Sequence, residues 1–228
     1  QVVELGGPIG VFEVAAAGRM EGEPVDAGGV VETLQANVNS ILDAGGIAQI
    51  NQPNDSWAFD HEDIVKVRDA SLLEVYNGHP STNSEGGPGK PSAEKIWDHV
   101  LSAGQVIFGV ATDDAHNYSD FTHTLANPGR GWVVVRASEL SVEAIVESLA
   151  TGQFYFSTGI ELARLETSDE TVSLEIVQHG DYVYDTRFIG KDGVVLSDSD
   201  ELEVSYDIRG DEGYVRASIR SSYGTRAW

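Results

Sequence analysis

The sequence contains no cysteine among its 228 residues. Disulfides, thiolate metal sites and a cysteine nucleophile are therefore excluded, and a metal ion could be held only by histidine, carboxylate or other oxygen ligands. Basic residues are few: 14 Lys and Arg stand against 37 Asp and Glu, which gives a formal net charge of -23. Because a surface that binds phosphate backbones needs Lys and Arg, we expect neither nucleic acids nor anionic membranes as partners.

Lysine is scarce even among these basic residues. Only four of the 14 are lysines, and the acidic residues are spread along the chain rather than gathered into a tail. This pattern is typical of a protein adapted to high salt, in which dissolved ions screen the repulsion between surface carboxylates. The alternative interpretation is an ordinary acidic surface that keeps the protein in solution.

Long apolar runs are also missing. No stretch approaches the roughly 18 to 20 apolar residues that span a bilayer, and no basic region followed by a short apolar stretch indicates a secretory signal. The sequence starts at Gln1 rather than Met, so we expect that residues upstream of Gln1 have been removed. The cellular location and the oligomeric state stay open.

Helical and strand periods alternate from about Gly28 to Gly159, which predicts an α/β fold built from βα units. Apolar residues at helical spacing predict a helix over Val30–Ala44, which Gly45 and Gly46 end. The other expected elements are strand 47–50, a helix from about residue 61, strand 72–76, helix 93–103, strands 105–112 and 132–136, helix 142–150 and strand 154–157. Such alternation closes most simply into a βα barrel or a doubly wound sheet, here over residues 1–160, with polar residues at the carboxyl ends of the strands.

Period-two alternation replaces this pattern in residues 161–228. Four segments show it, near residues 171–177, 182–189, 202–208 and 214–219, and turn signals such as Lys191-Asp192-Gly193 separate them. The sequence therefore predicts a second domain, a small antiparallel β-sandwich, after the βα domain.

The strongest local motif is Asp113-Asp114-Ala115-His116 at the end of a buried strand. Residues two apart in an extended segment point the same way, so Asp114 and His116 are expected to project together from the carboxyl edge of the sheet. A carboxylate and an imidazole that converge there suit a divalent metal ion. The alternative is that Asp114 caps a following helix and His116 is a hydrogen-bonded loop residue.

Other polar residues follow neighbouring strands. Asn77-Gly78-His79-Pro80 ends one strand, and His79 is either a further metal ligand or a structural turn residue. Asn51-Gln52-Pro53-Asn54 places amides at the same edge, where they suit substrate oxygens better than zinc, iron or manganese. Arg130 could clamp a phosphate or carboxylate, or lie on the surface. His61 and His123 are expected to be solvated, and no role is assigned to these two histidines, His99 or His179.

Several common catalytic motifs are absent. The chain has no Gly-rich phosphate loop, no Gly-x-Ser-x-Gly elbow and no His-Glu-x-x-His pair. The motifs typical of P-loop nucleotide chemistry and of elbow-type serine hydrolysis are therefore missing. The remaining candidate site is a partial His/Asp metal cluster.

Longer stretches carry a resemblance that covers nearly the whole chain after about Gly28. They are residues 45–54, 74–78, 96–98, 111–118, 129–132, the helix after Ser141, and residues 152–159, 188–190 and 213–217. In this order they resemble the polymerase-and-histidinol-phosphatase (PHP) family of metallohydrolases, in particular the branch that includes carbamate-insecticide hydrolases. The most specific stretch is Asp113-Asp114-Ala115-His116 within its long flanks.

The resemblance implies that this chain is the C-terminal part of a distorted PHP-type βα barrel, followed by the small sandwich. It also implies two or three metal ions, usually zinc, manganese or iron, which activate a water for attack on a phosphoester or related bond of a small-molecule substrate. Asp114 and His116 match the final Asp-x-His metal ligands of the family, and His79 is a weaker match. The substrate would meet Gln52, Asn77 and Arg130. No residue is assigned as catalytic.

The sequence departs from the family pattern at two places. The opening His-x-His pair and the Glu ligand that follows it have no counterpart in these 228 residues. Where the family has Asn-His-Pro with a ligating histidine, this chain has Asn51-Gln52-Pro53. We therefore expect an incomplete metal site and weak or absent catalysis by this chain alone.

Two other functions stay open. In one, a non-catalytic descendant of the family binds a ligand through Gln52, Asn77, His79 and Arg130 without metal chemistry. In the other, the chain is an interaction module whose small β domain is the contact surface.

Overall fold

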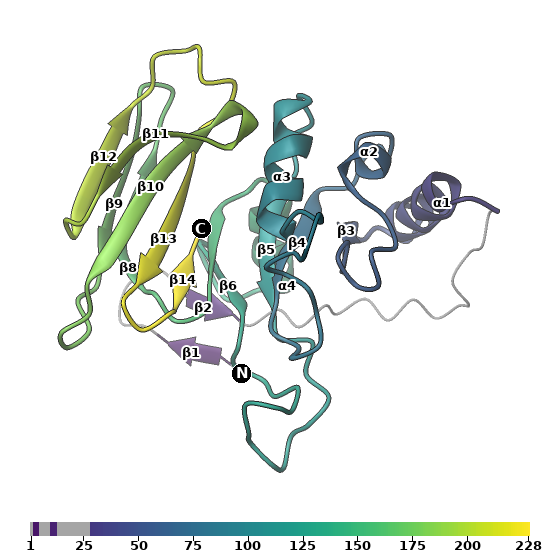
Figure 1. The fold of residues 1–228 in the computed structure, drawn as a ribbon, viewed down its shortest axis with the longest axis horizontal. Coiled ribbons are helices and arrows are strands. Elements are labelled where there is room, and N and C mark those ends of the chain that lie inside the picture. The colour runs from purple at the N-terminus through teal and green to yellow at the C-terminus, as the bar shows by residue number, and fades with distance from the viewer. Residues whose placement is uncertain (1, 5–9, 13–27) are drawn as a thin grey trace. The chain divides into compact units, whose positions relative to one another are not determined.

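The computed structural model describes residues 2–4, 10–12 and 28–228, with side chains from residue 28 onward (Figure 1). The chain divides into two compact units, residues 1–156 and residues 157–228, close to the boundary expected between residues 160 and 161. Helices and strands alternate in the first unit, whereas the second consists of strands and one short 3-10 helix. The α/β class predicted from the sequence is confirmed.

The first unit carries the βα pattern. Its elements are β1 (Val2–Glu4), β2 (Gly10–Phe12), α1 (Val30–Asp43), β3 (Gln49–Ile50), α2 (His61–Ile64), β4 (Leu72–Asn77), α3 (Ala93–Ser102), β5 (Phe108–Thr112), β6 (Trp132–Val135), α4 (Val142–Ala150) and β7 (Phe154–Ser157). β1 and β2 pair antiparallel, and β3, β4 and β5 form a parallel sheet in that order. The elements from α1 to β7 lie at or within a few residues of the predicted ones.

The parallel sheet explains the apolar run of its middle strand. Hydrogen bonds join β4 to β3 on one side and to β5 on the other, and Leu72, Leu73 and Val75 are buried. Strands covered on both faces need such near-continuous apolar sequences. The described sheets are open and do not close into a barrel. They establish the α/β class but not the βα barrel.

The helices bury one face each. Ser92 caps α3 by accepting a hydrogen bond from the Lys95 backbone N–H at 3.2 Å. Within α3, Trp97 is buried, donates from Nε1 to the Ile107 carbonyl at 2.8 Å and packs its ring edge-on against Phe156. Figure 1 shows α1, α2 and α3 side by side, and α3 contacts β4. None of the helices in the described ranges combines the length and apolar character needed to cross a bilayer.

The second unit contains two antiparallel sheets. Its elements are β8 (Leu162–Thr167), β9 (Thr171–Ile176), β10 (Tyr184–Gly190), η1 (Lys191–Gly193), β11 (Val194–Ser199), β12 (Glu203–Asp207), β13 (Arg216–Ser221) and β14 (Arg226–Ala227). One sheet has the order β12-β9-β8, and the other contains β11-β10-β13-β14. Phe188 of β10 stacks on Tyr206 of β12 with ring centroids 5.6 Å apart, so apolar side chains of the two sheets meet, as in a sandwich.

Three strands of this unit were not predicted. β8 and β11 are edge strands whose residues are mostly exposed or half-buried, and β14 is only two residues long. Neither β8 nor β11 buries a residue fully, so both lack the alternation of buried and exposed positions that the edge strand β12 retains. The four predicted segments correspond to the more deeply buried strands β9, β10, β12 and β13.

Candidate functional site

Polar residues gather at the carboxyl ends of the parallel strands. Gln52 follows β3, Asn77 ends β4, and Asp114 follows β5. The Gln52 Nε2 donates to Asp114 Oδ2 at 2.7 Å, and the Asn77 Nδ2 donates to the same oxygen at 3.2 Å. Because parallel strands end at the same edge of a sheet, three residues far apart in the sequence form one hydrogen-bonded group.

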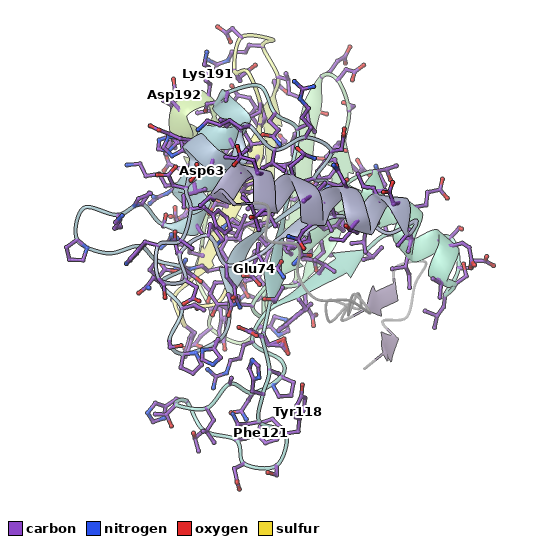
Figure 2. The ribbon with its side chains drawn as sticks, turned by 90° about the vertical axis from the view of Figure 1, so that its right-hand side faces the viewer. Asp63, Glu74, Tyr118, Phe121, Lys191 and Asp192 are labelled. Atoms are coloured by element: carbon purple, nitrogen blue, oxygen red, sulfur yellow. The ribbon has the colours of Figure 1, made fainter. Side chains whose placement is uncertain are left out.

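Glu74 of β4 lies at the centre of this group, and Figure 2 labels it. Its side chain is only 4% exposed. Oε2 accepts hydrogen bonds from the Gln52 backbone N–H at 2.9 Å and from Asn77 Nδ2 at 3.2 Å, and Oε1 accepts from Thr112 Oγ1 at 2.6 Å. One buried carboxylate therefore ties together the ends of all three strands.

Burial raises the pKa of the Glu74 carboxyl above its ordinary value, because the charged form loses its hydration. Hydrogen bonds from Thr112, Asn77 and Gln52 oppose this rise, and the nearby Asp114 carboxylate adds to it. A small cavity lies beside these groups, and its lining includes Gln52, Glu74 and Asn77. A carboxyl whose pKa is shifted by burial and by a charged neighbour beside a cavity is a candidate for a functional site.

Asp114 and His116 meet, as predicted, but not in the way expected. The strand ends at Thr112, and Asp114 has a left-handed backbone with φ 49°, so strand alternation does not bring the two side chains together. His116 Nε2 nevertheless lies at hydrogen-bond distance, 3.1 Å, from Asp114 Oδ1, so His116 is a hydrogen-bonded loop residue, as the alternative interpretation expected. Residues 113–131 contain no helix, so Asp114 is not a helix cap.

A second strained position faces Asp114. Gln52 has φ 53°, and its backbone N–H is bound to Glu74. Residues other than glycine adopt a left-handed backbone at a cost of about 1–2 kcal/mol, and such residues cluster at sites where function fixes the geometry. The hydrogen bonds of Glu74 and Asp114 hold both turns in place.

His79 lies close to His116, with ring centroids 5.7 Å apart at an angle of 85°. Its Nδ1 accepts a hydrogen bond from the Ser81 backbone N–H at 3.2 Å, and Ser81 Oγ lies 2.8 Å from the same atom. A nitrogen that accepts from a backbone N–H carries no proton, so the neutral ring holds its proton on Nε2. This tautomer favours donation to a ligand oxygen, because a metal-bound histidine usually donates from its other nitrogen.

Arg130 holds the loop that follows Asp114. Its guanidinium donates to the carbonyls of Gly78 at 3.3 Å and Thr122 at 2.7 Å, and reaches Asn127 Oδ1 at 3.5 Å. Asp113 accepts from the Gly129 N–H at 2.9 Å and closes the base of the same loop. Arg130 therefore stabilises the loop through these hydrogen bonds. Contact of Arg130 with a substrate stays a prediction.

The close packing of the loop requires a glycine at position 78. A Cβ atom there would lie 2.5 Å from Arg130 Cβ and 3.2 Å from Asp113 Cα. The Gly78 N–H also donates to the Thr112 carbonyl at 2.8 Å. The absent side chain lets the ends of β4 and β5 lie next to the arginine.

The Asp114 and His116 side chains have the spacing of two ligands on one metal ion. Two ligand atoms on one tetrahedral zinc ion lie about 3.3 Å apart, and Asp114 Oδ1 and His116 Nε2 are 3.1 Å apart. Within residues 28–228, however, no three His, Asp or Glu side chains gather closely enough to hold an ion. The pair therefore supplies part of a ligand set.

Glu74 and Thr112 were missed as site residues. One signal was available: Glu74 is a lone charged residue inside the apolar strand 72–76. A buried carboxylate in such a strand needs several donors, and they come from segments 22 and 38 residues away. Finding them requires the strand order, which local sequence patterns do not contain.

Comparisons with known proteins leave the family unassigned. No model of a known protein family, no curated protein and no solved structure matches the chain. The functional argument therefore rests on the residues and geometry of the site.

Proposed function

We propose that the chain is a metal-dependent hydrolase of the PHP type, with phosphoesters or related small molecules as substrates. Its metal site is incomplete in this chain. The observation that carries the proposal is the Asp114 and His116 pair, 3.1 Å apart, at the carboxyl edge of a parallel sheet. The finer fold belongs to the same proposal: the open sheet β3-β4-β5 would be the C-terminal part of a distorted PHP-type barrel. The two sheets of the second unit would be its appended sandwich.

In this proposal the residues of the site divide into three tasks. Asp114 and His116 would hold the divalent ion, which supplies Lewis acidity when bound. Asn77 and Gln52 hold the Asp114 carboxylate in place through their amide donors. The His79 Nε2–H is positioned to donate to a substrate oxygen, since its Nδ1 is occupied by Ser81.

The ligand set limits activity in this proposal. Gln52 stands where the family pattern has a ligating histidine, and its Nε2 is 2.7 Å from Asp114 Oδ2. An amide N–H satisfies that oxygen but contributes no metal ligand. We therefore expect weak or absent hydrolysis by this chain alone.

The test is an assay of chromogenic phosphate monoesters and diesters at high salt, with zinc, manganese or iron added. We expect no turnover above that of an Asp114→Ala, His116→Ala double variant. Clear metal-dependent turnover that the double variant lacks would support the hydrolase and contradict its incompleteness. Failure of both proteins to bind any of the three metals would contradict the hydrolase itself.

A second candidate function is ligand binding without metal. Asp114 Oδ2 already accepts two amide hydrogen bonds, so the carboxylate is satisfied within the described site without an ion. Calorimetric titration with inorganic phosphate in the presence of a chelator tests this function. Binding that His79→Ala weakens at least about tenfold, a loss of about 1.4 kcal/mol, would support it, whereas no binding in either protein would contradict it.

A further inference from the structure

Two histidines that the proposed hydrolase does not use lie in ring contact. His61 is the first residue of α2, and His99 lies in the last turn of α3. Their ring centroids are 4.4 Å apart and the rings are tilted by 46°. The two helices pack against each other, so the contact joins elements that are separate in the sequence.

The nitrogen Nδ1 of His61 is buried, and the described part of the chain offers it no hydrogen-bond partner. His61 was expected to be solvated, and this atom shows that the expectation was wrong for one side of the ring. The ring nitrogens of His61 are one donor and one acceptor in the neutral form, and a buried nitrogen without a partner calls for a bound water or ion. Both residues are partly exposed, so a small solute can reach the rings.

We propose that His61 and His99 bind one divalent transition-metal ion, of the zinc, nickel or copper class, which links α2 to α3. Two imidazoles on one tetrahedral zinc ion place their ring centroids about 5 Å apart, and the centroids of His61 and His99 are 4.4 Å apart. Neutral imidazoles are good ligands for these metals, and water completes the coordination. The ion satisfies the buried nitrogen of His61, for which residues 28–228 offer no hydrogen-bond partner.

The charge of the surroundings favours a cation. Asp60 and Glu62 flank His61 in the sequence, Asp98 precedes His99, and the chain as a whole carries a net charge of -23. A negative field raises the local concentration of cations. Magnesium and calcium prefer oxygen ligands, so the imidazole pair selects transition metals from that population.

This site shares no residue with the Asp114 and His116 pair, and the proposal does not depend on the proposed function. The two sites can therefore be separated by substitution. The starting protein is the full chain with Asp114→Ala and His116→Ala, which removes the other pair of ligands. Nickel and zinc binding to it are measured by calorimetry at neutral pH and again at pH 5.

We expect the Asp114→Ala, His116→Ala protein to bind one ion. Adding either His61→Ala or His99→Ala should weaken binding at least about tenfold, as the loss of one of two ligands predicts. Binding should also weaken at pH 5, because protons compete for both imidazoles. His123→Ala, in an exposed loop, is the matched control and should leave the affinity unchanged.

A second readout covers variants that fold poorly. An ion that links α2 to α3 raises the thermal unfolding midpoint of the starting protein, and His61→Asn, which retains a polar group, should remove this rise while keeping the far-ultraviolet circular dichroism of the parent. No ion in the starting protein, or an affinity that none of the His61 and His99 variants changes, overturns the proposal.

Discussion

Among residues 28–228 each unit buries one glutamate, and the pKa values of the two carboxyls shift in opposite directions. In the first unit, burial raises the pKa of Glu74, and the Asp114 carboxylate adds to the rise. In the second unit, hydrogen bonds lower the pKa of Glu212 from 4.5 to about 2, first among them the bond from the Arg209 N–H, at 2.7 Å. Both side chains accept several hydrogen bonds, so the number of donors does not explain the difference.

The balance between burial and hydrogen bonding explains it: loss of hydration is the largest effect on the pKa of Glu74, whereas at Glu212 the hydrogen bond from the Arg209 N–H outweighs it. Glu212 accepts from the backbone N–H groups of Arg209 and Gly210 and from the Tyr206 hydroxyl, which all favour its charged form. Glu74 shares its Asn77 donor with Asp114, a second negative charge. Glu212 fixes a turn. Glu74 lies beside a second carboxylate, Asp114, at a sheet edge, and a bound cation would relieve the repulsion between these two carboxylates.

The largest effect is expected from Glu74→Ala. This change leaves donors of Gln52, Asn77 and Thr112 without an acceptor and opens a cavity, so the free energy of unfolding should fall by about 3 kcal/mol. Glu74→Gln keeps the shape and removes the like charge beside Asp114, so it should cost less than about 1 kcal/mol at neutral pH. Urea unfolding measures both. Equal losses in the two variants would show that the charge of Glu74 is as important as its shape.

Gly78→Ala should have the next largest effect. The added Cβ would meet Arg130 Cβ at 2.5 Å, and the loop must move to make room, at a cost of about 2 kcal/mol. Gly87→Ala is the control, because its nearest neighbour is the Trp57 ring at 3.3 Å. The measurement is the thermal unfolding midpoint of the wild type, Gly78→Ala and Gly87→Ala. If Gly78→Ala is as stable as Gly87→Ala, Arg130 does not hold the loop as tightly as the distances indicate.

Glu212→Gln tests the opposite shift through pH. A lowered pKa stabilises the fold above the ordinary value of 4.5, and this stabilisation is lost as the pH falls from about 4.5 toward 2. The wild type should therefore lose stability steeply over that range, and Glu212→Gln should be less stable at pH 6 and show a flatter slope. The raised pKa of Glu74 acts in reverse, since its stabilisation declines as the pH rises above 4.5. An unchanged acid slope in Glu212→Gln would contradict the assignment.

Gln52→His should change stability least. Histidine tolerates the left-handed backbone at this position, where φ is 53°. Its imidazole would add a third ligand beside Asp114 and His116, and metal affinity should rise at least about tenfold. Calorimetry with zinc measures the change, with Gln52→Asn as a control of similar polarity. A Gln52→His protein that binds zinc no better than the control would show that position 52 does not face the ion.

The elements of the first unit could be predicted because their signals are local. Ser141 caps α4 as expected, accepting a hydrogen bond from the Ala144 N–H at 3.2 Å, and β7 covers the predicted residues. Most of the site could not be predicted in this way. The bonds of Glu74 to Gln52 and Thr112 depend on the order β3-β4-β5, and the turn at Asp114 depends on a left-handed backbone.

The metal content of the purified chain at high salt tests the central claim most directly. It is measured by mass spectrometry in a His61→Ala background, so that only the Asp114 and His116 pair is counted. We expect bound zinc, manganese or iron that disappears when Asp114→Ala and His116→Ala are added. The same metal content in both proteins, whether zero or one ion, would contradict a metal site at Asp114 and His116.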